Sequence, residues 1–232
     1  MIRTVLKEII ASNSMLPFAI RDEVVKQTMH IQELFPTPII ITHIDKALNQ
    51  KTLAFIKSKE IKYVRNRGGN SISSDLYTLE SDELNDIKKV LTDSVNEYFK
   101  KIVNPGKDMK LNITTSWINV NKNGESHHKH KHPNSIVSAI LYIDTCEGDT
   151  ISFIKEHQDL FGNFKYTGTH ATMWYSAECF GSVVVNTLIM FPSTLPHQVN
   201  PRPNTCTGTR ISLAFNTWFK GEMDLGVDSL RC

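Results

Sequence analysis

The spacing of apolar residues changes near residue 105. Between 81 and 103 apolar side chains recur every three or four residues, the period of an amphipathic helix. They are Leu84, Ile87, Leu91, Val95, Tyr98, Phe99 and Ile102. Ser81 can cap this helix, Asp82 and Glu83 suit its positive end, and Asn104-Pro105-Gly106 ends it. A shorter helix is predicted from about 46 to 59.

Beyond this break the apolar period becomes two, which is typical of strands. Strands are predicted at 110–121, 135–144, 149–155, 171–176, 183–191 and 208–219, with Gly, Pro and Asn clusters between them. An earlier strand is predicted in the β-branched run that ends at Asp45. Helices followed by many short strands favour a mainly β (α+β) fold, a β-sandwich or jelly-roll core buttressed by the N-terminal helices.

Composition and charge narrow the function classes. The chain has 232 residues, 40% of them hydrophobic, and a net charge of +2, which argues against a large phosphate-binding surface. Nucleic acid is therefore not indicated as a partner. The four cysteines form no CxxC pair and are expected to be free thiols in a reducing compartment. Without a signal-like or membrane-spanning run, the chain is predicted to be cytoplasmic, and the sequence leaves the oligomeric state open.

Four of the nine histidines lie between His127 and His132. In an extended segment His128, His130 and His132 would share one face, and two imidazoles two residues apart can point at one metal ion. His197, in a predicted turn between two strands, could supply a third ligand and leave other metal positions open for catalysis. The alternative is a solvated basic loop that binds metals only adventitiously.

Arg210 begins the last predicted strand, where it shares a face with Ser212, Ala214, Asn216 and Trp218. A buried arginine is costly unless it is paired with an anion, and a carboxylate ligand would meet that need.

Together these residues resemble the Fe(II)/2-oxoglutarate-dependent oxygenases, which have a double-stranded β-helix core. The family pattern of His-x-Asp/Glu, a distal His and an Arg ten to fifteen residues later maps onto His130-Lys131-His132, His197 and Arg210-Ile211-Ser212. Gly124 and Tyr142 match positions of the prolyl-hydroxylase branch. The segments LFPTPI, SWINVNKNGESHHKHKHPNS, LYI, LIMFPSTLPH and RISLAFN are similar to oxygenases encoded by marine bacteria and their phages.

The resemblance implies a site and a reaction. His130, His132 and His197 would bind Fe(II), and Arg210, Ser212 and Tyr142 would bind the co-substrate 2-oxoglutarate. O2 would then hydroxylate a peptidyl side chain or a small molecule, with release of succinate and CO2. Trp117, Asn119, Asn121, Asn216 and Trp218 could line the substrate mouth, although core packing is the alternative for the aromatic residues. His127 and His128 are expected to be exposed neighbours, with His128 a reserve ligand.

The resemblance also sets the expected domain organisation. Residues 29–232 would form a single oxygenase domain, with helical support at about 46–104 and a jelly-roll core at about 109–220. Residues 1–28 would be an N-terminal extension, and flexible chain is one alternative for it. If the gene is a phage gene, the protein would act in the host cytoplasm.

Two departures from the family pattern matter. His132 replaces the usual carboxylate, so the protein ligands would leave Fe(II) with its full +2 charge, which the dianionic co-substrate could neutralise. Asn186 stands where the family tends to have a turn glycine, and asparagine tolerates the left-handed conformation.

Two other functions remain open. The first is a cupin-type dioxygenase with three histidine ligands and no 2-oxoglutarate. The second is a non-catalytic jelly-roll binding or virion module whose histidines decorate the surface.

Overall fold

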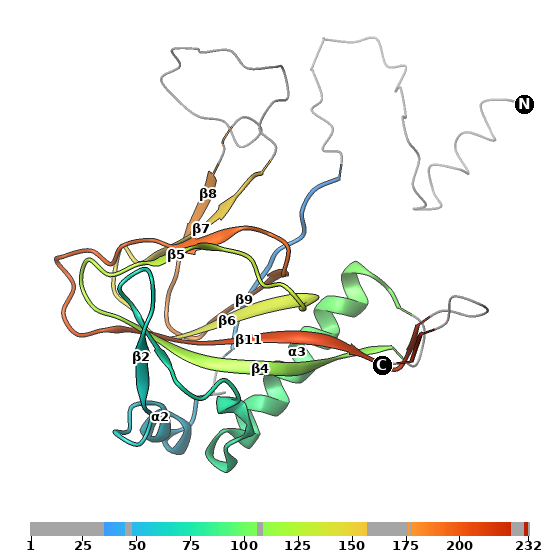
Figure 1. Ribbon diagram of the computed structural model, residues 1–232, viewed down its shortest axis with the longest axis horizontal. Coiled ribbons are helices and arrows are strands. Elements are labelled where there is room, and N and C mark those ends of the chain that lie inside the picture. The colour runs from blue at the N-terminus through green and yellow to red at the C-terminus, as the bar shows by residue number, and fades with distance from the viewer. Residues whose placement is uncertain are drawn as a thin grey trace, which may run out of the picture. The chain divides into compact units, whose positions relative to one another are not determined.

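Two antiparallel sheets face each other across the strand-rich part of the chain (Figure 1). The computed structural model describes residues 35–44, 48–105, 109–156, 176, 178–223 and 230–231. The large sheet has seven strands in the order β1 (Ile40–His43), β9 (Thr187–Pro192), β6 (Val137–Asp144), β11 (Arg210–Lys220), β4 (Lys110–Asn121), β3 (Ser71–Ser73) and β2 (Tyr63–Arg65). The small sheet has four in the order β5 (His127–His130), β10 (His197–Val199), β7 (Thr150–Ile154) and β8 (Glu178–Ser182).

Most predicted strands are confirmed, and the short ones were missed. The prediction of 110–121 coincides with β4, the runs at 135–144 and 149–155 contain β6 and β7, and the run at 208–219 covers all of β11 except Lys220. The run at 183–191 begins too early, because β9 starts at Thr187 and β8 ends at Ser182. The missed strands have two to five residues, which is too short for a period of two to be recognised. They include β2, β3, β8, β10 and the pair β12 (Glu222–Met223) and β13 (Leu230–Arg231). The predicted strand 171–176 lies almost wholly outside the described residues.

The large sheet is buried on both faces. Along β6 the alternate residues Ala139, Leu141 and Ile143 join the cluster that contains the helices, whereas Ile140 and Tyr142 join the cluster that faces the small sheet. Strand β11 divides in the same way, with Leu213 toward the helices. Successive side chains of a strand point to opposite faces, so a strand with two covered faces is apolar throughout.

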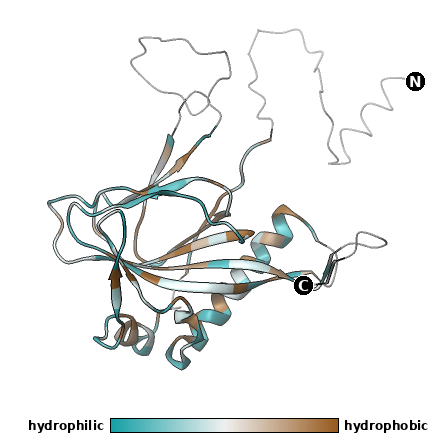
Figure 2. Cartoon of the chain, viewed as in Figure 1, coloured by the Kyte–Doolittle hydropathy of each residue, from teal (hydrophilic) through white to brown (hydrophobic). Residues whose placement is uncertain are grey.

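Two helices pack on the outer face of the large sheet. Helix α3 (Asn85–Ile102) buries the predicted apolar stripe apart from Ile102 and leaves polar residues outside, as Figure 2 shows by its alternating colours. The 3₁₀ turns η1 (Thr78–Glu80) and η2 (Asp82–Leu84) precede it, so the helix begins at Asn85 and the expectation that Ser81 caps it was wrong. The predicted helix 46–59 is the shorter α2 (Gln50–Ile56), capped by the Asn49 side chain.

Turn residues behave as their chemistry requires. Asn186 has a φ of 67°, which confirms that asparagine provides the left-handed turn before β9. Gly124, in the turn before β5, has a φ of 75°, a conformation that strains residues with a Cβ atom.

Cysteine pairing differs from the expectation. Cys146 and Cys206 form a disulfide across 60 residues, with Cα atoms 6.0 Å apart, whereas Cys179 is free and exposed. A sequence spacing cannot show that two loops meet in space, which is why the sequence indicated four free thiols. The fourth cysteine, Cys232, and the predicted extension 1–28 lie outside the described residues. Among the described helices, none has the length and apolar character needed to cross a membrane.

Candidate metal centre and co-substrate pocket

The histidine run lies on β5, at the edge of the small sheet, and pairs with β10. His130 lies opposite His197, and His127 lies opposite Val199. Between these two pairs the chain advances three residues along β5 but only two along β10, so β5 carries one extra residue, which is the arrangement of a β-bulge. The pairing brings His197 next to the run, as the sequence predicted.

The bulge changes which histidines share a face. Regular alternation would place His128 beside His130, but the extra residue turns His127 to the side of His130. The rings of His127 and His130 stack with centroids 4.3 Å apart and planes 17° apart. His127 is therefore a wall of the cavity, and the expectation that His127 and His128 are exposed neighbours was wrong, since both are partly buried.

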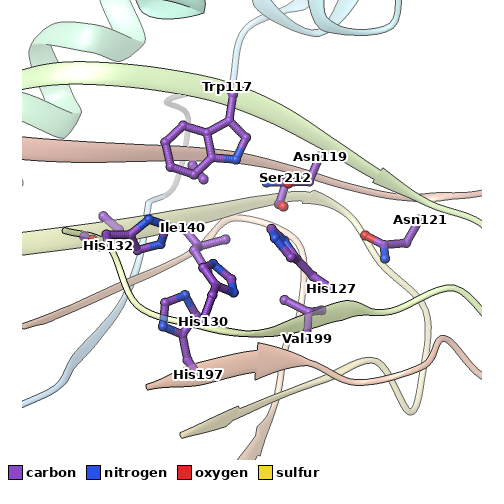
Figure 3. Close-up of a pocket in the computed structure, with 13 residues that line it drawn as sticks. Trp117, Asn119, Asn121, His127, His130, His132, Ile140, His197, Val199 and Ser212 are labelled. Carbon is purple, nitrogen blue, oxygen red and sulfur yellow. The ribbon is translucent and has the colours of Figure 1, made fainter. Parts of the chain in front are cut away.

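His130, His132 and His197 converge. One ring nitrogen from each lies within 4.8 Å of the others, and Figure 3 shows the three rings turned toward one another. The His197 side chain is almost wholly buried, so the cluster is not a surface decoration. Three nitrogen ligands on one side of a metal ion leave its other positions open, which a catalytic site requires.

Backbone hydrogen bonds fix the protons of two of the rings. Nδ1 of His130 lies 2.7 Å from the carbonyl oxygen of His128, and Nδ1 of His197 lies 3.0 Å from that of Leu195. A carbonyl oxygen can only accept, so each Nδ1 carries the hydrogen and each Nε2 keeps a lone pair. This is the usual way in which a protein orients a histidine for a metal.

The three imidazoles are neutral near pH 7. Burial lowers the pKa of His132 to about 3 and that of His197 to about 4, and neighbouring imidazoles lower both further. The pKa of His130 is also lowered, mainly by burial. Only a neutral imidazole binds a metal, so the residues fit a divalent ion with a preference for nitrogen ligands.

A second set of three histidines shares one member with the first. His127, His128 and His130 also bring one ring nitrogen each within 4.8 Å of the others. However, Nε2 of His127 is 3.0 Å from the side-chain amide of Asn66, and this contact uses one of its two nitrogens. Both candidate sets among the described residues consist of histidine alone, without a carboxylate.

A cavity runs from the three converging rings along the inner face of β4 and β11 (Figure 3). Its wall includes Trp117, Asn119, Asn121 and Ser212 together with His127, His130, His132 and His197. A second, more open cavity adjoins the same rings and is lined by Asn66, Ile72, Leu76, Thr115, Trp117, Asn216 and the histidines of the run. Trp218 lines neither cavity; it is 39% exposed and its ring packs on Phe219. A register shift after Asn216 moves it off the face predicted for it.

Arg210 is buried as predicted, but its carboxylate partner belongs to the chain. Its Nη1 lies 2.8 Å from Oδ1 of Asp149, and its Nη2 donates to the carbonyl oxygen of Asn200. The anion that Arg210 was expected to need is thus provided within the chain by Asp149, where the sequence had pointed to a carboxylate ligand. Arg210 is not among the residues that line the cavity, although its register partner Asn121 is.

Tyr142 on β6 and Ser212 on β11 pair with each other in register. The Tyr142 hydroxyl is buried and has no hydrogen-bond partner among the residues that the structure describes. Burial raises the pKa of Tyr142, the charge of Arg210 lowers it, and the charge of Asp149 raises it further. Tyr142 is therefore close enough to both charged side chains to interact with them electrostatically. A buried hydroxyl without a partner is unusual, and it fits a ligand that would accept a hydrogen bond from it.

Sequence reasoning missed three residues of this region: His127, Asp149 and Arg202. His127 could be assigned only through the bulge. Asp149 begins a predicted strand, and the need of buried Arg210 for an anion was a signal that pointed to such a residue. Arg202, 2% exposed, gave no signal of burial in a segment that contains two prolines.

A comparison with protein families gave one match. Residues 115–216 match the model of a family described as "Putative 2OG-Fe(II) oxygenase". The match spans β4 to β11 and includes the three histidines and Arg210. A search of curated proteins gave no match.

Several solved structures share the fold. An oxidoreductase of the 2OG-Fe(II) oxygenase family from Burkholderia pseudomallei is 13% identical, with a TM-score of 0.51 over 77% of this chain and 83% of that one. A prolyl hydroxylase from Trichoplax adhaerens, in complex with a peptide fragment of hypoxia inducible factor, is 13% identical, with a TM-score of 0.51 over 78% and 83%. The epimerase SnoN, in complex with Fe3+, alpha ketoglutarate and nogalamycin RO, is 13% identical, with a TM-score of 0.52 over 84% and 89%. At such identities the likeness shows the fold, the double-stranded β-helix.

Proposed function

We propose that this chain, whose residues 115–216 match the 2OG-Fe(II) oxygenase family, is an Fe(II)- and 2-oxoglutarate-dependent dioxygenase that hydroxylates a peptidyl side chain or a small molecule. Succinate and CO2 would be released. The family match and the fold indicate an oxidoreductase.

One observation carries the proposal. The ligand atoms of His130, His132 and His197 converge, and the rings of His130 and His197 are held with their Nε2 lone pairs free. Any buried ring N–H needs a partner, but a histidine that served only packing would not need a free lone pair turned toward two other imidazoles. The arrangement therefore supports a resident divalent metal.

The three-histidine set fits a dianionic co-substrate. Three neutral imidazoles leave the +2 charge of Fe(II) unchanged, and 2-oxoglutarate carries two negative charges. Bound together, Fe(II), 2-oxoglutarate and O2 would supply the oxidising power that breaks a substrate C–H bond. His132, in place of a carboxylate, would keep the loaded site electrically neutral.

The protein's own residues would position and shield the reactants. The bonds of His130 and His197 to backbone carbonyls fix two ligand rings, and Trp117 packs on His132 with ring centroids 5.6 Å apart. Ser212 and the Tyr142 hydroxyl would donate to the co-substrate, and Arg210 would attract its distal carboxylate.

The second cavity favours an uncharged substrate group. Its wall holds amides, apolar side chains and neutral imidazoles, and none of the described residues that line it is Asp, Glu, Lys or Arg. Asn66 and Asn216 offer hydrogen bonds to such a group, and Leu76 and Trp117 offer apolar contact. These features support a neutral side chain of a peptide, as in the T. adhaerens complex, or a neutral part of a small molecule.

An anaerobic titration tests the proposal. Protein loaded with Fe(II) is mixed with 2-oxoglutarate, and we expect a metal-to-ligand charge-transfer band in the visible range, followed by succinate when O2 is admitted. The H197A variant provides the control, because it should show neither. If Fe(II) is bound to the wild type and no band appears, the proposal fails.

The second candidate is a three-histidine dioxygenase without 2-oxoglutarate. It is favoured by the finding that Arg210 already pairs with Asp149 and is not among the residues that line the cavity. In that case Fe(II) would bind, the band would be absent, and oxygen uptake would not depend on added 2-oxoglutarate.

A further inference from the structure

A second guanidinium lies beside Arg210 in the interior. The Arg202 side chain is 1% exposed, and its Nε lies 3.7 Å from Oδ2 of Asp149, whose other oxygen binds Arg210. Its Nη2 donates to the carbonyl oxygen of Thr207 at 3.2 Å, but Nε and Nη1 have no hydrogen-bond partner in the described part of the chain. Arg202 therefore has unpaired hydrogen-bond donors in the protein interior, where donors are normally hydrogen-bonded.

The three ionic side chains do not balance. Arg202 and Arg210 contribute two positive charges and Asp149 one negative charge, and the three side chains are 0 to 1% exposed. A buried charge that lacks a counter-charge is strongly destabilising, so this arrangement favours an additional anion. Asp149 offers one negative charge to two guanidinium groups, and its Oδ2 also accepts from the backbone N–H of Cys146 at 2.9 Å.

Two more unpaired donors lie nearby. Among the described residues, the hydroxyl of Tyr142 and the side-chain amide nitrogen of Asn121 are buried without a partner, and the one unpaired acceptor that lines the same cavity is Oδ1 of Asn119. Asn121 pairs in register with Arg210 and lines the cavity that leads to the metal ligands. A set of unpaired donors together with one excess positive charge matches the chemistry of a carboxylate.

We propose that Arg202 is a second positive determinant of the pocket for the distal carboxylate of the co-substrate, and that it selects 2-oxo acids with two carboxylates over those with one. The inference rests on the proposed function. Asp149 offsets one guanidinium, so Arg210 alone would offer a neutral ion pair to the incoming carboxylate. Arg202 restores the net positive charge, and the pocket can compensate a full negative charge in the interior.

Two loops are tied together to hold this arrangement. The backbone of Arg202 forms two hydrogen bonds with the turn before β5, to Gly124 and Glu125, at 2.9 and 3.1 Å. The Cys146–Cys206 disulfide joins the loop of Asp149 to the loop that follows Arg202. These links fix Arg202 relative to the histidine run as well as to Asp149.

The test measures binding of two 2-oxo acids to the Fe(II)-loaded full chain under anaerobic conditions, by titration calorimetry and by the charge-transfer band. The probes are 2-oxoglutarate and pyruvate, which lacks the distal carboxylate. We expect R202Q to raise the Kd for 2-oxoglutarate by about tenfold or more and to leave the Kd for pyruvate unchanged. R202K, which keeps the charge without the planar donor array, should lie between R202Q and the wild type. R67Q removes an exposed arginine and should behave as the wild type.

Three results would overturn the inference. If R202Q binds 2-oxoglutarate as the wild type does, Arg202 is not part of the pocket. If R202Q weakens both acids equally, Arg202 has only a structural role. If the wild type holds Fe(II) but does not bind 2-oxoglutarate, the proposed function itself fails, and the inference with it. Thermal unfolding and zinc binding report whether each variant is folded; if R202Q is not, R202M provides the uncharged variant, since methionine is easier to bury.

Discussion

Two buried clusters are built on different electrostatic principles: the converging histidines, here called the histidine end, and Arg202, Arg210 and Asp149, here called the arginine end. At the histidine end, neutral imidazoles converge with free lone pairs, and a metal ion would add the charge. At the arginine end, two permanent cations share one carboxylate, so the charge is already present and one positive charge remains uncompensated. We therefore expect the stability of the histidine end to depend on metal and on pH, and that of the arginine end to depend on internal ion pairing.

The largest expected effect is on metal binding. H197A should lose stoichiometric Fe(II) or Zn(II), with a rise in Kd of about 100-fold or more, because one of three ligands is removed. H128A is the matched control, since His128 belongs only to the second histidine set. Metal content measured on purified protein distinguishes the sets: loss in H128A with retention in H197A would reverse the assignment.

The arginine end should respond most strongly to the loss of its carboxylate. D149N keeps the side-chain shape but leaves two buried guanidinium groups without a counter-charge, and should lower the free energy of unfolding by about 3–5 kcal/mol. Urea unfolding of metal-free protein gives this value. D144N is the control: Asp144 pairs with Lys57 at the surface, with side chains 40% and 50% exposed, so about 1 kcal/mol or less is expected. Equal losses in both variants would show that the buried pairing has no special weight.

The disulfide should support the arginine end and leave the histidine end unchanged. Replacing both Cys146 and Cys206 by serine should cost about 2–4 kcal/mol of stability, because the bond closes a long loop in the unfolded chain. The Kd for zinc should stay that of the wild type. A loss of zinc affinity in the double variant would show that the two ends are coupled.

The stability of the metal-free protein should also depend on pH, through the histidine end. The four lowered histidine pKa values lie below the unfolded value of about 6.5, so the unfolded chain binds more protons as the pH falls. The free energy of unfolding should therefore decrease from about pH 7 to pH 4. Urea midpoints between these values check this, and H197N should show a shallower decrease because one such group is gone. A midpoint that does not change with pH would mean that the histidines are solvated.

Particular residues show how far sequence reasoning reached. The apolar stripe of α3 and the alternation of β4, β6 and β11 could be predicted because both depend on local periodicity. His197 and Arg210 could be matched to the histidine run through the family pattern. The bulge in β5 could not be predicted, because it depends on pairing with β10, and it is the bulge that moves His127 into the cavity.

The sequence by itself thus determined the fold class, the three converging histidines and the need of Arg210 for an anion. Only the tertiary structure decided which anion meets that need, which cysteines pair, and that Arg202 lies in the interior. The physical reason is range. Periodicity and motifs report on neighbours along the chain, whereas Asp149 with Arg210 and Cys146 with Cys206 are contacts across 61 and 60 residues, formed only when the two sheets close on each other.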